Sequence, residues 1–237
     1  MKGSCVIRSV LETYEQNELI FASKLYREKL SEYISEMAYY KMLERLCKSG
    51  ELAKAAKGIY YIPNVSKYGV VPPSEKQIVE AFTRNDTGTV IGYAMYNNLN
   101  LTTQVSKNVN VLSSALEGFS KTVGNVVVKQ VQLEYSEPVQ NMIRGLEVLQ
   151  NFYEIQDINY SAFIEFSEKI ASTYQDEIFE MIIAETTYKK STIAFLQEVL
   201  NYYEVSNNLE QYLSSLSTYK HPKMEEIYEI ARVSRGV

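Results

Sequence analysis

The sequence predicts a mixed α+β fold that is mostly helical: an N-terminal winged helix-turn-helix, a small α+β unit and a C-terminal helical region. Three observations lead to this prediction. Three helical patterns and a hairpin pattern follow one another in residues 1–65. Short β-favouring runs then alternate with helical patterns, and from residue 137 the apolar residues recur at helical spacing. We therefore expect two domains, residues 1–65 and residues 66–237.

The first two helices are short. One is predicted to end near Gln16, because apolar side chains recur at helical spacing up to Tyr14. Ser23 is a residue type favoured at the N-cap, so a second helix is predicted over Lys24–Leu30.

A third helix and a hairpin complete this segment. The helix is predicted from Ser35 to Lys48, ended by Gly50, with one apolar face. Residues 51–63 predict a hairpin whose basic turn contains Lys57 and Gly58. In a winged helix the third helix enters the major groove and the hairpin touches the backbone or the minor groove.

The candidate DNA-binding side chains lie on the polar face of the third helix and on the hairpin. They combine cations that reach phosphates with small or aromatic residues that fit a groove. They are Ser35, Ala38, Tyr40, Lys41, Arg45, Lys48, Lys54 and Lys57. The alternative is a solvated helix face on which Glu44 and Lys48 form an ordinary i,i+4 pair.

The remaining elements follow from local signals. Residues 64–73 predict a turn-rich connection, and Ser74 caps a helix through Thr83. Strands are predicted near residue 88 and over Val109–Leu112 and Val126–Tyr135, with a short helix after the first. The C-terminal helices carry apolar stripes, of which residues 139–149 form the first, residues 209–216 a later one and the helix after Pro222 the last.

Charge divides unevenly along the chain. The 237 residues carry 24 basic and 29 acidic side chains, a net charge of −5. Residues 1–63 hold 10 basic and 8 acidic side chains, a net +2, whereas residues 64–237 hold 14 and 21, a net −7. The whole-chain charge thus averages a mildly basic segment, suited to nucleic acid, with an acidic one.

Several function classes lack their sequence signals. Two cysteines outside a CxxC pair and one histidine, His221, predict no metal site, and no phosphate-binding glycine loop occurs, so no cofactor is expected. We expect a cytoplasmic protein, because secretory and membrane-spanning segments are also missing. We also expect that it is no enzyme, because no catalytic set of side chains can be assembled from the sequence. Two carboxylate clusters, at residues 176–180 and 225–229, are expected on solvated helix faces.

Four stretches occur in a characteristic order: RLCKSGELAKAAKGIYYIP (45–63), YGVVPPS (68–74), GYAMYNNLNLTTQVS (92–106) and YKKSTIAFLQEVL…LEQYLSSLSTYK (188–220). This order resembles the AbiEi-like antitoxins of type IV toxin–antitoxin (abortive infection) systems and related bacterial transcriptional regulators. The resemblance spans most of the chain.

The resemblance implies a repressor of its own operon that counteracts a nucleotidyltransferase-like toxin, often without touching it. By the same resemblance, Arg45 and the turn Lys57-Gly58 belong to the DNA-binding surface, and Leu101, Thr102, Thr103 and Gln104 form the antitoxin-domain motif. The expected partner is double-stranded operator DNA with an inverted repeat, read by two copies of the chain, as in a homodimer.

Two other classes of function remain as alternatives. The acidic half suits a protein–protein interaction module that never binds DNA. An enzyme acting through the carboxylate clusters or the Thr-Thr-Gln loop ranks last, because the sequence contains no set of nucleophile, base and orienting group.

Overall fold

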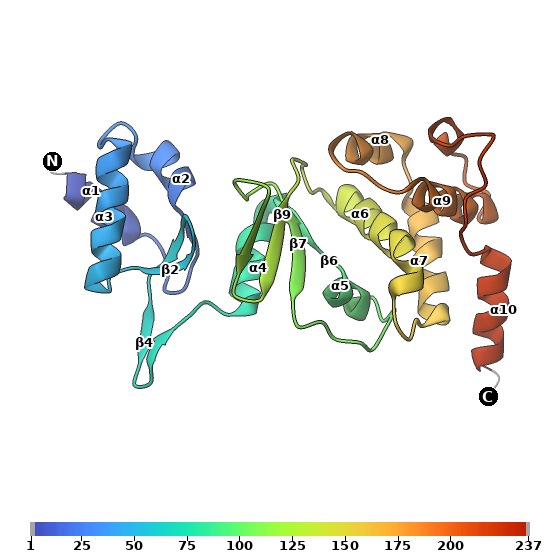
Figure 1. Cartoon of the computed structure of the whole chain (residues 1–237), viewed down its shortest axis with the longest axis horizontal. Coiled ribbons are helices and arrows are strands. Elements are labelled where there is room, and N and C mark those ends of the chain that lie inside the picture. Colours follow the sequence, from blue (N-terminus) through green and yellow to red (C-terminus); the bar gives the residue numbers. More distant parts are fainter. Residues whose placement is uncertain (1–2, 236–237) are drawn as a thin grey trace. The chain divides into compact units, whose positions relative to one another are not determined.

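The structure, a computed structural model, describes residues 3–235 and has a mixed α+β fold (Figure 1), as the sequence predicts. The chain forms two compact units. The first contains residues up to Ala81 together with Lys121–Val126, and the second contains Phe82–Ser120 and Val127–Val237. The segment between residues 66 and 81 therefore belongs to the same unit as the N-terminal helices.

The first unit begins with helical segments and a small sheet. In chain order these are α1 (Gly3–Leu11), β1 (Ile20–Phe21), α2 (Ala22–Leu25), the π-helical turn η1 (Tyr26–Leu30), α3 (Glu36–Ser49), β2 (Ala53–Ala56) and β3 (Ile59–Tyr61). The sheet is antiparallel in the order β1-β3-β2, with Ile20 opposite Tyr60 and Ala53 opposite Tyr61. Periodicity cannot reveal β1, because a strand of two residues has no alternation to detect.

Two predicted details of the first helices are wrong. α1 ends at Leu11 rather than near Gln16, because the chain turns toward the sheet: Asn17 adopts a left-handed φ of 64° and its amide donates to the carbonyl of Ile62 at 2.9 Å. Ser23 is not an N-cap. It lies inside α2, whose N-cap residue is Phe21.

α3 follows its prediction closely. Gly50 ends the helix with a left-handed φ of 79°, and its amide donates to the carbonyl of Cys47 at 3.3 Å. The inner face places Tyr39, Leu43 and Leu46 in the core of the first unit. This core also contains apolar side chains from α1, β1, α2 and η1, so it fixes α3 against the rest of the unit.

A second hairpin replaces the predicted turn-rich connection at residues 64–73. β4 (Asn64–Ser66) pairs antiparallel with β5 (Gly69–Val71) through a turn at Lys67 and Tyr68. The prediction is wrong because three-residue strands with mostly exposed side chains lack the alternation of a half-buried strand. α4 (Glu75–Thr83) begins as predicted: Ser74 Oγ accepts from the Gln77 amide at 3.3 Å, and Gln77 Oε1 accepts from the Ser74 amide at 2.9 Å.

A four-stranded sheet and short helices make up the middle of the chain. They are the 3₁₀ turn η2 (Arg84–Asp86), β6 (Gly88–Ile91), α5 (Tyr93–Asn98), β7 (Val109–Ser113), β8 (Ser120–Val123) and β9 (Val126–Gln130), with strand order β6-β7-β9-β8. The predicted strand over residues 126–135 ends at Gln130. Beyond it the chain leaves the sheet, and the amide of the buried Tyr135 donates to the Asp86 carbonyl at 3.0 Å.

The rest of the second unit is helical. Its elements are α6 (Glu137–Gln150), the 3₁₀ turn η3 (Phe152–Glu154), α7 (Tyr160–Thr173), α8 (Asp176–Glu185), α9 (Lys190–Tyr202), the 3₁₀ turn η4 (Leu209–Tyr212) and α10 (Met224–Arg235). α6 packs against α7, α8 and α9, while α10 packs against α7 and α9 (Figure 1). The predicted stripe at residues 139–149 is buried, so α6 is central to this core.

The stripe predicted over residues 209–216 is not a helix. Only Leu209–Tyr212 is helical, as a 3₁₀ turn, and Leu216 is 96% exposed. Serines here bond to the backbone instead: Ser214 Oγ accepts from the Leu216 amide at 3.3 Å, which competes with helix formation. His221 lies just before α10, where its ring stacks on Phe195 with 5.9 Å between ring centroids.

Candidate functional site

The exposed face of α3 brings together most of the predicted contact residues. Ala38, Lys41, Arg45 and Lys48 are all exposed, and their spacing of three to four residues places them on one side of the helix. The opposite side is the buried one that contains Leu43. The structure therefore presents an exposed helical surface with three cations in line.

Two predicted residues lie away from the centre of this face. Ser35 is the N-cap position of α3 and makes no capping hydrogen bond through its side chain. Tyr40 is half-buried, and its ring lies against Tyr39 with 5.2 Å between centroids. Both flank the exposed face, and Tyr40 contributes to packing as well as to the surface.

The hairpin places two further cations beside the sheet. Lys54 lies on β2 opposite Tyr60, and Lys57 lies in the turn between β2 and β3; both are exposed. Gly58 follows with a φ of 77°, a conformation that favours glycine. The backbone of this turn is fixed, because the Lys57 carbonyl accepts from Lys121 Nζ at 2.8 Å and the Gly58 carbonyl accepts from the Ala22 amide at 3.0 Å.

One acidic side chain divides the charge of the α3 face. Glu44 Oε1 lies 2.8 Å from Lys48 Nζ, and the hydrogen bond from Lys48 lowers the pKa of Glu44, with Arg45 adding to the effect. Glu44 thus partly neutralises the cations around it. The i,i+4 pair expected from the sequence exists, and the cationic character of the face rests most on Lys41 and Arg45.

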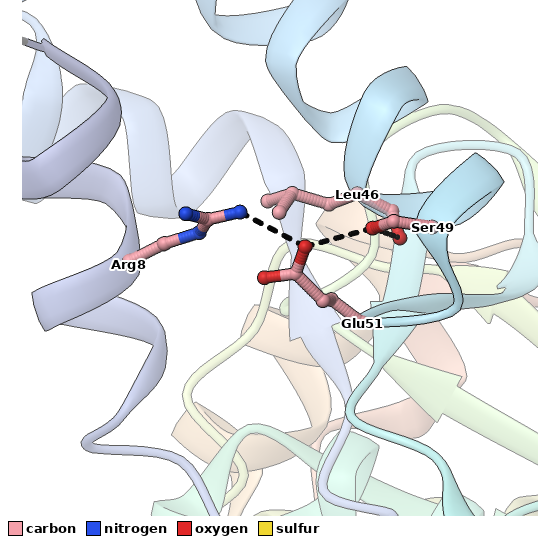
Figure 2. A network of polar contacts seen from close by, with 4 residues as sticks. All are labelled: Arg8, Leu46, Ser49 and Glu51. Carbon is pink, nitrogen blue, oxygen red and sulfur yellow. Dashed lines mark hydrogen bonds and ion pairs between the residues drawn. The ribbon is translucent and has the colours of Figure 1, made fainter.

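A polar network holds the C-terminal end of α3 (Figure 2). Arg8 of α1 and the hydroxyl of Ser49 both donate to Glu51 Oε1, at 2.9 and 2.8 Å, and Ser49 Oγ also lies 3.1 Å from the Leu46 carbonyl. Hydrogen bonding from Ser49 is the main cause that lowers the pKa of Glu51. The exposed ion pair adds little stability, but the network orients the end of α3 relative to α1.

The sequence patterns missed two apolar side chains at the start of α3. Met37 is 71% exposed on the same face as Lys41, and Tyr33 is 64% exposed just before the helix. Helical spacing could have predicted the exposure of Met37, because Met37 lies one turn before Lys41 on the polar face of the helix. Large apolar side chains that remain exposed often mark a contact surface.

The Leu-Thr-Thr-Gln motif fastens two loops of the second unit together. Thr102 Oγ1 donates to the Gln156 carbonyl at 2.6 Å and accepts from the Gln104 amide at 3.1 Å. Gln104 Nε2 donates to Asp157 Oδ2 at 2.6 Å, while the carbonyl of the buried Leu101 accepts from the Asn159 amide at 2.8 Å. Thr103 is exposed. The polar groups of Thr102 and Gln104 therefore brace the backbone.

A cavity of about 280 Å³ lies within the second unit. Its walls come from β6, α5, β7, β9, α6 and η3. Seven side chains with polar groups line it: Tyr93, Tyr96, Asn110, Lys129, Glu147, Asn151 and Glu154. Ligand pockets typically measure about 300–1,000 Å³, so this cavity lies just below that range and suits only a compact molecule.

The acidic cluster at residues 176–180 is engaged in local contacts, whereas Glu225, Glu226 and Glu229 are exposed on α10. Asp176 Oδ1 accepts from the Tyr174 hydroxyl at 2.7 Å and from the Asn208 amide at 3.1 Å, and Glu180 Oε1 accepts from the Tyr212 hydroxyl at 3.2 Å. Within residues 3–235 no group of three or more His, Cys, Asp or Glu residues is arranged to hold a metal ion. Asp176 and Glu180 hold η4 and the start of α8 together.

Comparison with known proteins identifies a family. Residues 7–150 match the model described as "Family of unknown function (DUF6088)". The chain belongs to this family. No curated protein matches it. It is similar at 8% identity to a solved structure, "Crystal structure of RV2827C protein from Mycobacterium tuberculosis", with a TM-score of 0.39, covering 85% of this chain and 77% of that chain.

The part of the chain that matches DUF6088 contains the α3 face and most of the cavity. It includes all of α3 and the β2–β3 hairpin, and it ends at residue 150 after contributing most of the cavity wall. Asn151 and Glu154 lie just beyond it. In the described part of this DUF6088 chain, helices are too short or too polar to cross a membrane.

Proposed function

We propose that the chain is a DNA-binding transcriptional repressor whose N-terminal segment is a winged helix-turn-helix. The observation that carries the proposal is the order α1, β1, α2, α3, β2, β3 around the sheet β1-β3-β2, with α3 exposing its outer face. This order places two helices behind a third one and a hairpin beside it, which is the arrangement that docks a helix in the major groove.

The proposed contacts follow from the chemistry of each side chain. Lys41, Arg45 and Lys48 reach phosphates or base edges from α3, since cations supply most of the affinity for DNA. Ala38 and Met37, at the N-terminal half of the helix, are small or apolar and fit against thymine methyl groups. Lys54 of the hairpin binds the backbone.

The hairpin turn and the β4–β5 hairpin extend this surface. Lys57 contacts phosphate from the turn of the first hairpin. Lys67 sits at the tip of the second, where its Nζ lies 4.9 Å from the centroid of the Tyr68 ring. Because residues 1–63 carry a net charge of only +2, binding by one copy is weak and salt-sensitive. Two copies on an inverted repeat, as in a homodimer, supply the affinity.

The antitoxin role rests on the resemblance to AbiEi-like proteins. In this proposal the chain represses its own operon in the cytoplasm and counteracts a nucleotidyltransferase-like toxin of a type IV system, with the second unit as the antitoxin part. No catalytic activity or cofactor is assigned. The first test is whether a nucleotidyltransferase-like toxin gene neighbours this gene. If it does, a growth assay with that toxin tests the role separately from DNA binding, since rescue by a variant that no longer binds DNA would assign the antitoxin role to the protein itself.

The test of DNA binding uses the chain and the DNA upstream of its own gene. Arg45→Ala is expected to weaken binding and to reduce the slope of log affinity against log salt by about one unit. The control Lys169→Ala removes an exposed cation from α7 and leaves binding unchanged. An unaltered salt slope in Arg45→Ala would contradict the assignment of α3.

The alternative is a protein–protein interaction module. Two observations favour it: the net charge of −7 in residues 64–237, and the exposed apolar side chains Val65, Tyr68 and Val70 on the β4–β5 hairpin. Co-purification of a partner protein together with no shift of any DNA fragment at low salt would support this function over repression.

A further inference from the structure

The cavity of the second unit contains a carboxylate without a close partner. Glu147 projects from α6 into the cavity wall, and among the described residues no side chain or amide donates a hydrogen bond to its carboxylate oxygens. Its backbone carbonyl, in contrast, accepts from Tyr96 and Asn151. A poorly solvated carboxylate is costly unless a positive or donating group approaches it.

The nearest cation of the cavity is Lys129 on β9. It acts on Glu147 electrostatically, yet the two do not form an ion pair within 4 Å in the described part of the chain. Burial raises the pKa of Glu147, and the charge of Lys129 opposes that rise. Lys129 is exposed, so solvent screens its charge more than it screens the largely buried Glu147.

Two tyrosine rings are held rigidly beside this carboxylate. The Tyr93 hydroxyl donates to the Glu154 carbonyl at 2.9 Å and accepts from the Gln156 amide at 3.3 Å. The Tyr96 hydroxyl accepts from Asn151 Nδ2 at 3.0 Å and lies 3.4 Å from the Glu147 carbonyl. Both hydroxyls are thus engaged, and the two rings lie 5.6 Å apart in an edge-to-face arrangement. Tyr96 is buried, whereas Tyr93 is half-buried and is the ring that a ligand can reach.

The backbone also keeps this space open. Gly92, between β6 and α5, has a φ of 70°, and a Cβ atom there would lie 3.2 Å from Asn110 Nδ2. The glycine therefore lets Asn110 lie close to the cavity wall, where its amide can donate or accept a hydrogen bond. Gly92 and Tyr93 thus form one wall of the cavity, and α6 contributes the carboxylate of Glu147.

We propose that this cavity binds a compact organic cation, an amine or guanidine, with Glu147 as its counter-ion and the Tyr93 ring beside it. Two carboxylates, Glu147 and Glu154, face one ammonium group, Lys129, so the cavity favours a positive ligand over an anionic one. Cations are also attracted to the faces of tyrosine rings. The inference is independent of DNA binding.

Isothermal titration calorimetry of the full chain with agmatine and with putrescine tests the proposal. At least one of the two cations is expected to bind, and 1,4-butanediol, which has putrescine's chain length without its charge, is not. Glu147→Gln is expected to weaken binding about tenfold or more, because a charge-assisted hydrogen bond is lost. The control Glu165→Gln removes an exposed carboxylate from α7 and leaves affinity unchanged.

Three outcomes overturn the proposal. They are no heat of binding with either cation, equal binding of the diol, and equal affinity of Glu147→Gln and the wild type. A far-ultraviolet circular dichroism melt of each variant separates lost binding from lost folding. A second variant, Tyr93→Leu, keeps the carboxylate and removes the ring. It is expected to weaken binding of the cation severalfold. Unchanged binding would show that the Tyr93 ring does not contact the ligand.

Discussion

The hydroxyl of Tyr39 donates a hydrogen bond of 3.0 Å to the carbonyl oxygen of Ala22. Both residues are fully buried, and burial raises the pKa of Tyr39, so the hydroxyl stays protonated and remains a donor. The Tyr39 ring also stacks on Tyr26, at 5.3 Å between centroids. One side chain of α3 therefore connects this helix to α2 through a polar contact and to η1 through an aromatic contact.

Tyr39→Phe is expected to destabilise the first unit by about 0.5–1.5 kcal/mol, because it removes one buried hydrogen bond to the Ala22 carbonyl, which keeps the bond from the Tyr26 amide. Urea denaturation followed by circular dichroism measures the change. Tyr68→Phe serves as the control, since the Tyr68 side chain is 88% exposed and its change should be within ~0.5 kcal/mol. Equal stability of both variants would show that the hydrogen bond contributes nothing.

Thr102→Val is expected to loosen the two loops that the Leu-Thr-Thr-Gln motif joins. The substitution keeps the shape but removes the donor to the Gln156 carbonyl and the acceptor for the Gln104 amide, at a cost of about 1–3 kcal/mol. Thr102→Ser retains the hydroxyl and should preserve most of the stability. Faster amide hydrogen exchange at residues 102–104 and 156–159 is expected in Thr102→Val. Identical exchange rates in both variants would show that the Thr102 hydroxyl does not hold the two loops together.

Gly88→Ala is expected to be among the most damaging single substitutions of the second unit. A Cβ atom at Gly88 would collide with the backbone carbonyls of Phe82 and Leu112, which cannot move like a flexible side chain. Gly118→Ala meets no atom within 4 Å and costs only about 1–2 kcal/mol, from its left-handed φ of 88°. Thermal melts of the two variants compare steric collision with backbone strain, and a smaller loss for Gly88→Ala would contradict the packing.

Glu44→Gln is expected to strengthen binding to operator DNA severalfold at low salt. The substitution removes a negative charge from the exposed face of α3 and releases Lys48 from its 2.8 Å ion pair. Fluorescence anisotropy at several salt concentrations measures the effect, which should shrink as salt rises. Glu185→Gln, an exposed residue at the end of α8, is the matched control. Weaker binding of Glu44→Gln would indicate that Glu44 contacts a base.

Glu147→Gln is expected to raise the melting temperature near pH 7. The pKa of Glu147 is raised above its ordinary value of 4.5 in the folded chain, so the folded state binds the proton more tightly than the unfolded state. Folding stability therefore falls as pH rises from about 4.5 through the higher folded pKa. The titratable groups that interact electrostatically with Glu147 are Lys129 on β9, Tyr96 on α5 and the buried Tyr188.

The comparison is a set of melts between pH 4 and pH 8. The difference between Glu147→Gln and the wild type should be small at the acidic end, where Glu147 is protonated, and largest at neutral pH. A constant difference across this range would show that Glu147 has no shifted pKa.

Local signals in the sequence predict much of this fold. The stripe on α6, the end of α3 at Gly50 and the N-cap at Ser74 all depend on residues within a few positions of one another, and all are confirmed. The β4–β5 hairpin is not predicted, because its side chains face solvent and therefore show no alternation of apolar and polar residues.

The two candidate sites differ in how far the sequence reveals them. The α3 face follows from helical periodicity, apart from the exposure of Met37. The cavity does not, because Tyr96, Lys129 and Glu147 lie far apart in the chain and meet only when α5, β9 and α6 pack together. Hydrophobic periodicity carries no information about such a convergence of polar groups.

Both strands of the β4–β5 hairpin are edge strands, because the sheet has no third member. An exposed strand edge with valines invites pairing with another chain, which leads to aggregation. Here the strands are only three residues long, Lys67 places a charge at the tip, and Pro72 and Pro73 follow β5 directly. Proline has no amide hydrogen to donate, so an added strand could extend no further. The hairpin can thus expose apolar side chains to a partner without becoming a template for fibres.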